Sequence, residues 1–448
     1  MPRFQVLTFP MLALGLVGAL LADAALADDL LPLGDDFQAN SYTTGFQESS
    51  AVAVAPGGDF VLVWESEQPG GAYSEIVARH FEADGSPGAA ELQVNTYTRG
   101  YQLEADVAAG SGQFFVVWKT THDGDNSGDS IRGRLLDGAG MPVADPFQVN
   151  GVTLDNQEDP RVAALAGGDF VVVYRSSTSL GDDNDSTSVQ AGRFDSSGSA
   201  VAQDFQVNFT TAGSQSDPDV AATTDGGFAV VWQSPDDMAD DGLMLRRYDS
   251  QGVPGPEQRV TDIGADEANQ ATVIEASSGQ FVVAWRQIDG DGAGDDAIWA
   301  RRLTSDGGAL GAPFQVNAWT TGDQREPQLL ARPGGGFLVA WQSQGASSPD
   351  GSEDAIQGRL FDGNGQPIGE ETTLNSTTFE RQVQPALGSS DGSSDGSADG
   401  DRFVVAFTSD TSTGTDPSGS IQARRFFIGI FADDFESGDL SAWSVTSP

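Results

Sequence analysis

The sequence predicts an all-β protein, a seven-bladed β-propeller in which each blade is a four-stranded antiparallel sheet. Three observations lead to this fold. One tetrapeptide recurs along the chain, each repeat holds four short segments with the residue pattern of strands, and the two ends of the chain supply complementary parts of one blade. We take these observations in turn.

The tetrapeptide Phe-Gln-Val-Asn, in exact or degenerate form, marks each repeat and returns after a number of residues in the mid-fifties. A fixed period of this length is typical of an array of identical supersecondary units. The copies are Phe37 to Asn40, Leu92 to Asn95, Phe147 to Asn150, Phe205 to Asn208, the degenerate Arg259 to Asp262, Phe314 to Asn317 and the shortened Leu374-Asn375.

Four strands are expected in each repeat. In the second repeat they cover Asp106 to Ala109, Phe114 to Trp118, Ile131 to Leu136 and Phe147 to Asn150. The second of these is apolar at nearly every position, so both faces of its sheet must be covered. No segment after residue 27 has a convincing helical period, so the neighbouring sheets must supply the cover, as in a propeller.

The ends of the chain indicate that the array closes into a ring. A lone fourth strand is expected at Asp36 to Ser41, and a first-second-third set at Val383 to Leu387, Phe403 to Phe407 and Ser420 to Phe427. Together they complete a seventh blade and leave no open edge. An open solenoid of stacked sheets, which would not need ends that complement each other, is the alternative, and a wide barrel is a more remote one.

The first residues have the pattern of a secretory signal peptide, with Arg3, a long apolar run through Leu21, and Ala25-Leu26-Ala27. We therefore divide the chain into a signal peptide (1–27), the propeller (28–427) and a C-terminal tail (428–448) that could act in sorting. No later segment has the apolar length of a transmembrane helix. We expect a protein that is secreted or held at a bacterial cell surface.

Composition excludes several kinds of chemistry. The chain has no cysteine and only two histidines, His80 and His122, so thiol catalysis and sites with Cys-ligated zinc are ruled out. The formal net charge is −44, which disfavours nucleic acid and anionic lipid as partners. This charge fits either solubility in a salty environment or cation binding.

Two aspartate-rich loops between second and third strands have the spacing of calcium ligands. Asp123, Asp125, Ser127 and Asp129 alternate, and Asp289, Asp291 and Asp295 nearly do, although Ala293 replaces one ligand. Oxygen ligands at alternate positions suit Ca²⁺, but neither loop has the glutamate that completes an EF-hand. Both Ca²⁺ loops and merely solvated Asp-Gly loops fit this pattern.

Two further residues recur once in each blade. A glutamine precedes each first strand, where a side-chain bond at the crossing between blades or a ligand-reading ring would explain it. An arginine lies near the end of each third strand, where we expect a scaffold bond to a carboxylate. The two sets are Gln47, Gln102, Gln157, Gln215, Gln270, Gln324 and Gln382, and Arg79, Arg134, Arg193, Arg247, Arg302, Arg359 and Arg425.

The repeat "Gly-Phe-Val-Val-Val-Trp … Ile-x-Ala-Arg-Arg-Phe-Asp … Phe-Gln-Val-Asn" over residues 36–427 resembles a β-propeller-type repeat of secreted bacterial proteins. Many of those proteins are large and carry haemolysin-type calcium-binding arrays or adhesin modules, and most have no assigned function. The tail Phe435-Glu436-Ser437-Gly438-Asp439-Leu440-Ser441-Ala442-Trp443 is similar to C-terminal tails of exported Gram-negative proteins. The resemblance implies an exported propeller.

These observations favour a binding or adhesion module over an enzyme, because the sequence contains no catalytic constellation. We expect a monomer that presents an acidic loop face to a glycan or an extracellular protein, with Ca²⁺ as a candidate stabiliser of that face. The alternative is a secreted propeller hydrolase or lyase with its pocket at the central channel. Such a pocket would need residues that depart from the repeat, and Trp299, Trp319 and His122 are departures of this kind.

Overall fold

The computed structural model describes the propeller residues in 15 segments: 29–67, 73–88, 90–121, 128–183, 185–202, 204–235, 241–262, 267–277, 279–292, 294–332, 335–345, 354–376, 381–389, 401–410 and 419–429. Within these segments the secondary structure is all β. None of the described residues forms a helix that is long and apolar enough to cross a membrane.

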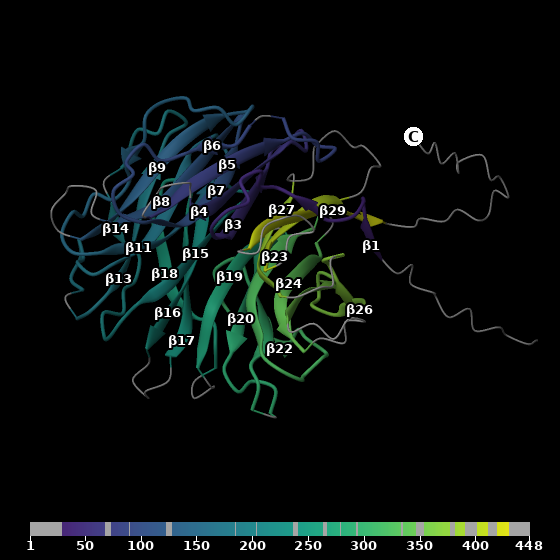
Figure 1. The fold of residues 1–448 in the computed structure, drawn as a ribbon. Coiled ribbons are helices and arrows are strands. Elements are labelled where there is room, and N and C mark those ends of the chain that lie inside the picture. Colours follow the sequence, from purple (N-terminus) through teal and green to yellow (C-terminus); the bar gives the residue numbers. More distant parts are fainter. Residues whose placement is uncertain are drawn as a thin grey trace, which may run out of the picture.

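The strands form seven antiparallel sheets, which confirms the predicted propeller (Figure 1). Blade 1 is β3 (Gln47–Val54), β4 (Phe60–Glu67), β5 (Ser74–Phe81) and β6 (Leu92–Gln93). Blade 2 is β7 (Gln102–Gly110), β8 (Gln113–Thr121), β9 (Asp129–Asp137) and β10 (Phe147–Gln148). Blade 3 is β11 (Gln157–Ala164), β12 (Phe170–Ser176), β13 (Ser188–Phe194) and β14 (Phe205–Gln206).

The other four blades follow the same order from the central channel outward. Blade 4 is β15 (Ser216–Ala222), β16 (Phe228–Pro235), β17 (Asp241–Tyr248) and β18 (Pro254–Arg259). Blade 5 is β19 (Ala268–Ser277), β20 (Gln280–Gln287), β21 (Ala297–Leu303) and β22 (Phe314–Gln315). Blade 6 is β23 (Gln324–Ala331), β24 (Phe337–Gln344), β25 (Asp354–Phe361) and β26 (Pro367–Thr373). Blade 7 is β27 (Gln382–Ser389), β28 (Asp401–Ser409) and β29 (Ser420–Gly429), completed by β1 (Asp29–Pro32) and β2 (Phe37–Gln38).

Strands from both ends of the chain close the ring, as predicted. Phe37 in β2 pairs with Ala423 in β29, and Asp29 in β1 pairs with Gly429 further along the same strand. The N-terminal contribution is therefore longer than the expected single strand, because two short segments share the fourth position of the blade. Figure 1 shows the yellow C-terminal strands beside the purple N-terminal ones.

The second strand of each blade forms the core, as its continuous apolar run predicts. In β4 every residue from Phe60 to Trp64 is fully buried. The two faces of this strand belong to different hydrophobic clusters. Val61 and Val63 pack toward blade 2, where Val116 lies, and Leu62 packs toward blade 7. Each blade is thus stabilised by burial against both neighbours rather than by a core of its own.

After the two paired residues of the fourth strand, the asparagine of the tetrapeptide bonds to the third strand through its side chain. Only the Phe-Gln part pairs as a strand in most blades, so the expected fourth strands were too long. Asn95 Oδ1 accepts the Ile76 main-chain N–H at 2.9 Å, and Thr261 takes the same role for Leu243 at 3.1 Å in the degenerate copy. The equivalent acceptors are Asn40, Asn150, Asn208, Asn317 and Asn375.

The recurring glutamine has a structural role. Gln47, Gln102 and Gln324 accept the indole N–H of the tryptophan in the adjacent strand at 2.9–3.1 Å. Gln157, Gln215 and Gln382 instead accept the amide of the tetrapeptide asparagine from the preceding blade. Gln270 is not a member of this set. The register places Ala268 at that position of blade 5, and Gln287 accepts the Trp285 N–H instead.

The recurring arginine bonds to a main-chain carbonyl in six blades, whereas the predicted carboxylate partner is found at Arg247, with Asp225, and at Arg301, with Asp262. Arg79 and Arg134 donate to the main-chain carbonyls of Ala39 and Val94, at 2.7 Å in both cases. These carbonyls come directly after the short fourth strand of the preceding blade, so the bond ties neighbouring blades together. The set also includes Arg246, Arg301, Arg359 and Arg424, so three predicted members were one residue too late. Gly192, not Arg193, occupies this position in blade 3.

Candidate functional site at the polar mouth of the channel

Each first strand carries a β-bulge where it enters the central channel. The register between the first and second strands shifts there in all seven blades. A residue in the left-handed region marks each bulge, with φ between 48° and 57°. These residues, which we call the first ring, are Ser49, Glu104, Asp159, Asp217, Gln270, Glu326 and Gln384. Bulges of this kind redirect side chains and are common beside functional sites.

Side chains of the first ring bond to the main chain of the next blade. Glu104 Oε2 accepts the Asp159 N–H at 2.9 Å, and Gln270 Oε1 accepts the Glu326 N–H at 3.0 Å. Gln384 closes the circle by accepting the Ser49 N–H at 3.0 Å. The left-handed conformation therefore satisfies backbone donors that a bulge takes out of the ladder.

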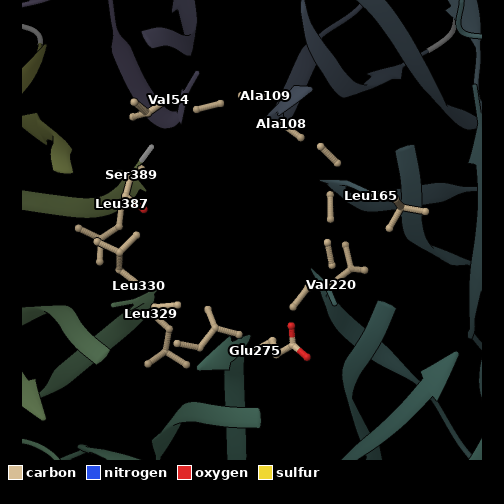
Figure 2. Close-up of a pocket in the computed structure, with 18 of the residues that line it drawn as sticks. Val54, Ala108, Ala109, Leu165, Val220, Glu275, Leu329, Leu330, Leu387 and Ser389 are labelled. Carbon is tan, nitrogen blue, oxygen red and sulfur yellow. The ribbon is translucent and has the colours of Figure 1, made fainter. Parts of the chain in front are cut away.

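The channel has two chambers of opposite character. The chamber at the start of the first strands, which we call the polar mouth, has a volume of about 590 Å³ and contains the first ring. The chamber at the other end, about 870 Å³, is lined mainly by aliphatic side chains, with Glu275 as an exception (Figure 2). Val52, Val107, Val220, Val273 and Leu387 border both chambers and form an aliphatic collar between them.

Charge is unevenly distributed in the polar mouth. Two residues beyond the first ring, blades 2, 3 and 4 present Asp106, Arg161 and Asp219. The equivalent positions in the other blades are uncharged: Ala51, Thr272, Gln328 and Ala386. Asp106 Oδ2 accepts the Val162 N–H and Asp219 Oδ2 accepts the Val273 N–H, both at 2.8 Å, so these two residues also link neighbouring blades. The other four blades fold with uncharged residues at this position, so the fold does not require the charges themselves.

The single lysine of the chain lies at the same side of the polar mouth. Lys119 forms ion pairs with Glu104 and, at 3.8 Å, with Glu158. Arg175 continues this network, with bonds of 2.5 Å to Glu158 and 2.8 Å to Asp159. Lys119 is 8% exposed, so this network is largely shielded from bulk water.

Several carboxyl groups of the polar mouth have raised pKa values. Burial raises the pKa of Glu65 to about 7, assisted by the nearby Glu48 and Glu104 and opposed by the Glu104 N–H that Glu65 accepts at 2.8 Å. Burial also raises the pKa of Asp106 to about 6, against the lowering effect of Arg161. Burial raises the pKa of Asp219 and of Asp217, and Asp159 adds to the rise at Asp217. Near neutral pH, Glu65 and Asp106 are therefore protonated to a larger extent than ordinary carboxyl groups.

Comparison with known proteins gives only distant similarities. No family model and no curated protein sequence matches the chain. A protein of unknown function from Dyadobacter fermentans is 14% identical with a TM-score of 0.49, over 88% of this chain and 98% of its own. The NanB sialidase of Streptococcus pneumoniae is 8% identical with a TM-score of 0.46, over 90% of this chain and 70% of its own. The phage phi92 endosialidase is 9% identical with a TM-score of 0.47, over 91% of this chain and 70% of its own. Identities this low transfer no activity to this chain.

The predicted metal ligands are only partly described. Asp123, Asp125 and Ser127 lie outside the described residues, and Asp129 begins β9, where its N–H donates to Asn156 Oδ1 at 3.2 Å. In the second loop, Asp291 Oδ1 accepts the Asp295 N–H at 3.2 Å, and Asp295 Oδ2 accepts the Gly322 N–H at 2.8 Å. Asp289 has a left-handed φ of 50°.

The described part of the chain contains no group of three or more His, Asp or Glu side chains that could hold a metal. In the 289–296 loop, oxygens of Asp291 and Asp295 cap backbone N–H groups, and calcium binding at Asp289, Asp291 and Asp295 stays a prediction. Calcium binding at Asp123 to Asp129 remains a prediction.

The aromatic departures noted in the sequence do not line the polar mouth. Trp299 packs against a hydrophobic cluster and donates its indole N–H to the Gly290 carbonyl at 3.1 Å. Trp319 is 37% exposed on the crossing between blades 5 and 6, and His122 lies outside the described residues.

Sequence reasoning missed the residues of the polar mouth. The signal was present, because a polar residue followed by proline comes two positions after the recurring glutamine in several repeats, as in Asp159-Pro160 and Glu326-Pro327. Aligning the repeats column by column would also have isolated Asp106, Arg161 and Asp219.

Proposed function

We propose that this protein is an extracellular, non-enzymatic binding propeller whose ligand enters the polar mouth. The observation that carries the proposal is the charged triplet Asp106, Arg161 and Asp219, which breaks the repeat at three adjacent blades of a rigid ring. Function on a repeated scaffold depends on such local departures. The −44 net charge favours a partner that is not a polyanion. The polar mouth opens on the face that carries the loops between second and third strands, and the predicted export would expose that face to extracellular partners.

The test compares the two chambers of the channel. Wild type, Arg161→Gln and Asp106→Asn would be screened on a glycan array and against extracellular proteins, with Glu275→Gln in the opposite chamber as the matched control. We expect the two polar-mouth variants to lose a partner that wild type and the Glu275→Gln variant retain. A partner that is lost only with Glu275→Gln would refute the proposal.

One observation favours a second candidate, a glycan-cleaving hydrolase. Glu65 and Asp106 both line the polar mouth, and with pKa values of about 7 and about 6 Glu65 would keep a sizeable protonated fraction near neutral pH while Asp106 is largely ionised. A general acid and a base of this kind are what glycoside hydrolysis needs. Release of reducing ends from a polysaccharide by wild type, and its loss in Asp106→Asn, would favour the enzyme over the binding module.

A further inference from the structure

Three exposed aromatic residues lie on the loop face of blades 1 and 2, each directly before a strand: Phe46 before β3, Tyr73 before β5 and Tyr101 before β7. Phe46 is 55% exposed, Tyr101 47% and Tyr73 38%. The rings of Tyr73 and Tyr101 meet edge to face with their centroids 5.1 Å apart. We call these three residues the aromatic rim.

The aromatic rim also departs from the repeat. Phe46 and Tyr101 each come immediately before the recurring glutamine. The same position in the other blades holds Asn156, Ser214, Glu267, Asp323 and Arg381. Because blades that lack an aromatic residue here still fold in the same way, the scaffold does not require these rings.

The aromatic rim lies beside the charged side of the polar mouth. Tyr101 precedes Glu104 by three residues, or about 10 Å along an extended chain. Its backbone position is fixed, since the Tyr101 N–H donates to Thr121 Oγ1 at 2.7 Å. Glu65 of blade 1 accepts the N–H of Glu104 in blade 2 at 2.8 Å. These two carboxylates therefore lie at the boundary between blades 1 and 2, where Tyr73 and Tyr101 also meet.

We infer that the polar mouth and the aromatic rim together bind an uncharged carbohydrate chain, an inference that rests on the proposed function of the polar mouth. Exposed aromatic rings offer flat apolar surfaces to the C–H faces of sugar rings. The carboxylate, amide and guanidinium groups of the polar mouth accept and donate hydrogen bonds as sugar hydroxyls require. A chain of several sugars would span both sets of residues.

The electrostatics of the chain select against anionic carbohydrates. With a net charge of −44 and more carboxylates than cations in the polar mouth, a polyuronic acid is repelled. An uncharged polysaccharide meets no such repulsion, and its hydroxyl groups can donate to the carboxylates of the polar mouth and accept from Arg161.

The experiment is affinity electrophoresis followed by calorimetry of the full propeller with dextran, xylan and galactomannan, and with polygalacturonate as the charged comparison. We expect at least one neutral polysaccharide to bind and polygalacturonate not to bind. Phe46→Ala and Tyr101→Ala should each raise the Kd about tenfold. The matched control is Phe209→Ala, because Phe209 is a 77% exposed aromatic residue on another blade crossing, and it should leave the Kd unchanged.

Two results would overturn the inference: no neutral polysaccharide binds, or the Kd does not respond to Phe46→Ala and Tyr101→Ala while melting temperatures confirm that both variants fold. The same experiment distinguishes a failure of this inference from a failure of the proposed function. A protein partner that is lost with Asp106→Asn but kept with Tyr101→Ala would leave the polar mouth as a binding site and end the carbohydrate assignment. A polysaccharide that responds to the rim but not to Asp106→Asn would contradict both.

Discussion

At the scale of single residues, the repeat contains residues that hold the ring together and residues that the ring does not need. Gln102 and Arg134 have partners at the same place in several blades, so their recurrence is explained by structure. Arg161 is the one basic residue at its position of the repeat, whereas the Lys119 position holds Arg175 in blade 3 and Arg286 in blade 5. Recurrence in this fold therefore indicates scaffold, and departures such as Arg161 are candidates for function.

The bond between Gln102 and Trp118 can be tested by removing its acceptor. Gln102→Leu keeps the side chain apolar and leaves a buried indole N–H unpaired, which should lower the free energy of unfolding by about 1–3 kcal/mol. Urea denaturation measures the change. In a Trp118→Phe background, which has no such donor, the same substitution should cost clearly less, and an equal cost would contradict the assigned role.

The pKa of Glu65 predicts how stability depends on pH. The pKa of about 7 in the folded state lies above the ordinary glutamate value of 4.5, so the folded state holds the proton more tightly than the unfolded state. The stabilisation is complete below about pH 4.5 and is lost as pH rises through about 7. Its loss is worth about 3 kcal/mol at most.

Glu65→Gln is the matched variant, because its amide oxygen can still accept the Glu104 N–H. Urea denaturation of both proteins from pH 4.5 to 8 should show a smaller decline for Glu65→Gln, which becomes the more stable protein above pH 7. Parallel curves would mean that Glu65 titrates normally.

At the scale of elements, the sequence predicted each strand from its apolar pattern but not its ends. The first strand of blade 2 was expected from Asp106 and begins at Gln102, because pairing resumes before the bulge. The bulge follows from backbone geometry and hydrogen bonds to the next blade, which no periodicity encodes. The aspartate-rich loops were recognised as loops, but their bonds to the next blade depend on tertiary structure.

The link between blades predicts the cost of removing a recurring arginine. Arg301 donates to the Val260 carbonyl at 2.7 Å across the boundary between blades 4 and 5. Arg301→Met keeps much of the apolar stem but leaves that carbonyl without its charged donor, so unfolding should become easier by about 1.5–3 kcal/mol. The exposed Arg99 is the control, and Arg99→Met should change stability by no more than about 0.5 kcal/mol.

At the scale of the whole molecule, the ring has a scaffold that repeats nearly seven-fold, but the charged triplet lies on one side of the polar mouth. Its asymmetry could not be read from the repeat consensus, because a consensus averages away the positions that differ. The fold was predictable for the opposite reason, since seven copies of one pattern reinforce each other.

Calcium should stabilise the propeller through the loop at Asp123 to Asp129. With a dissociation constant typical of extracellular sites, about 10⁻⁴ to 10⁻³ M, the gain is about 2.7 kcal/mol at a hundredfold excess over that constant. Melting curves in CaCl₂ should rise above those in MgCl₂ and NaCl at equal ionic strength, and Asp125→Asn should remove the difference. Equal shifts in all three salts would leave only general screening of the −44 charge.

The closure of blade 7 also determines the order in which the molecule can fold. Blades 1 to 6 are built from strands that follow one another in the chain, so their pairing is local. The Ile421 N–H, by contrast, donates to Asn40, 381 residues away. Contacts of such sequence separation form slowly, although the loop-closure entropy grows only with the logarithm of length. A growing chain therefore cannot finish the ring until its last strand exists, and the apolar face of blade 1 that packs against blade 7 stays uncovered until then.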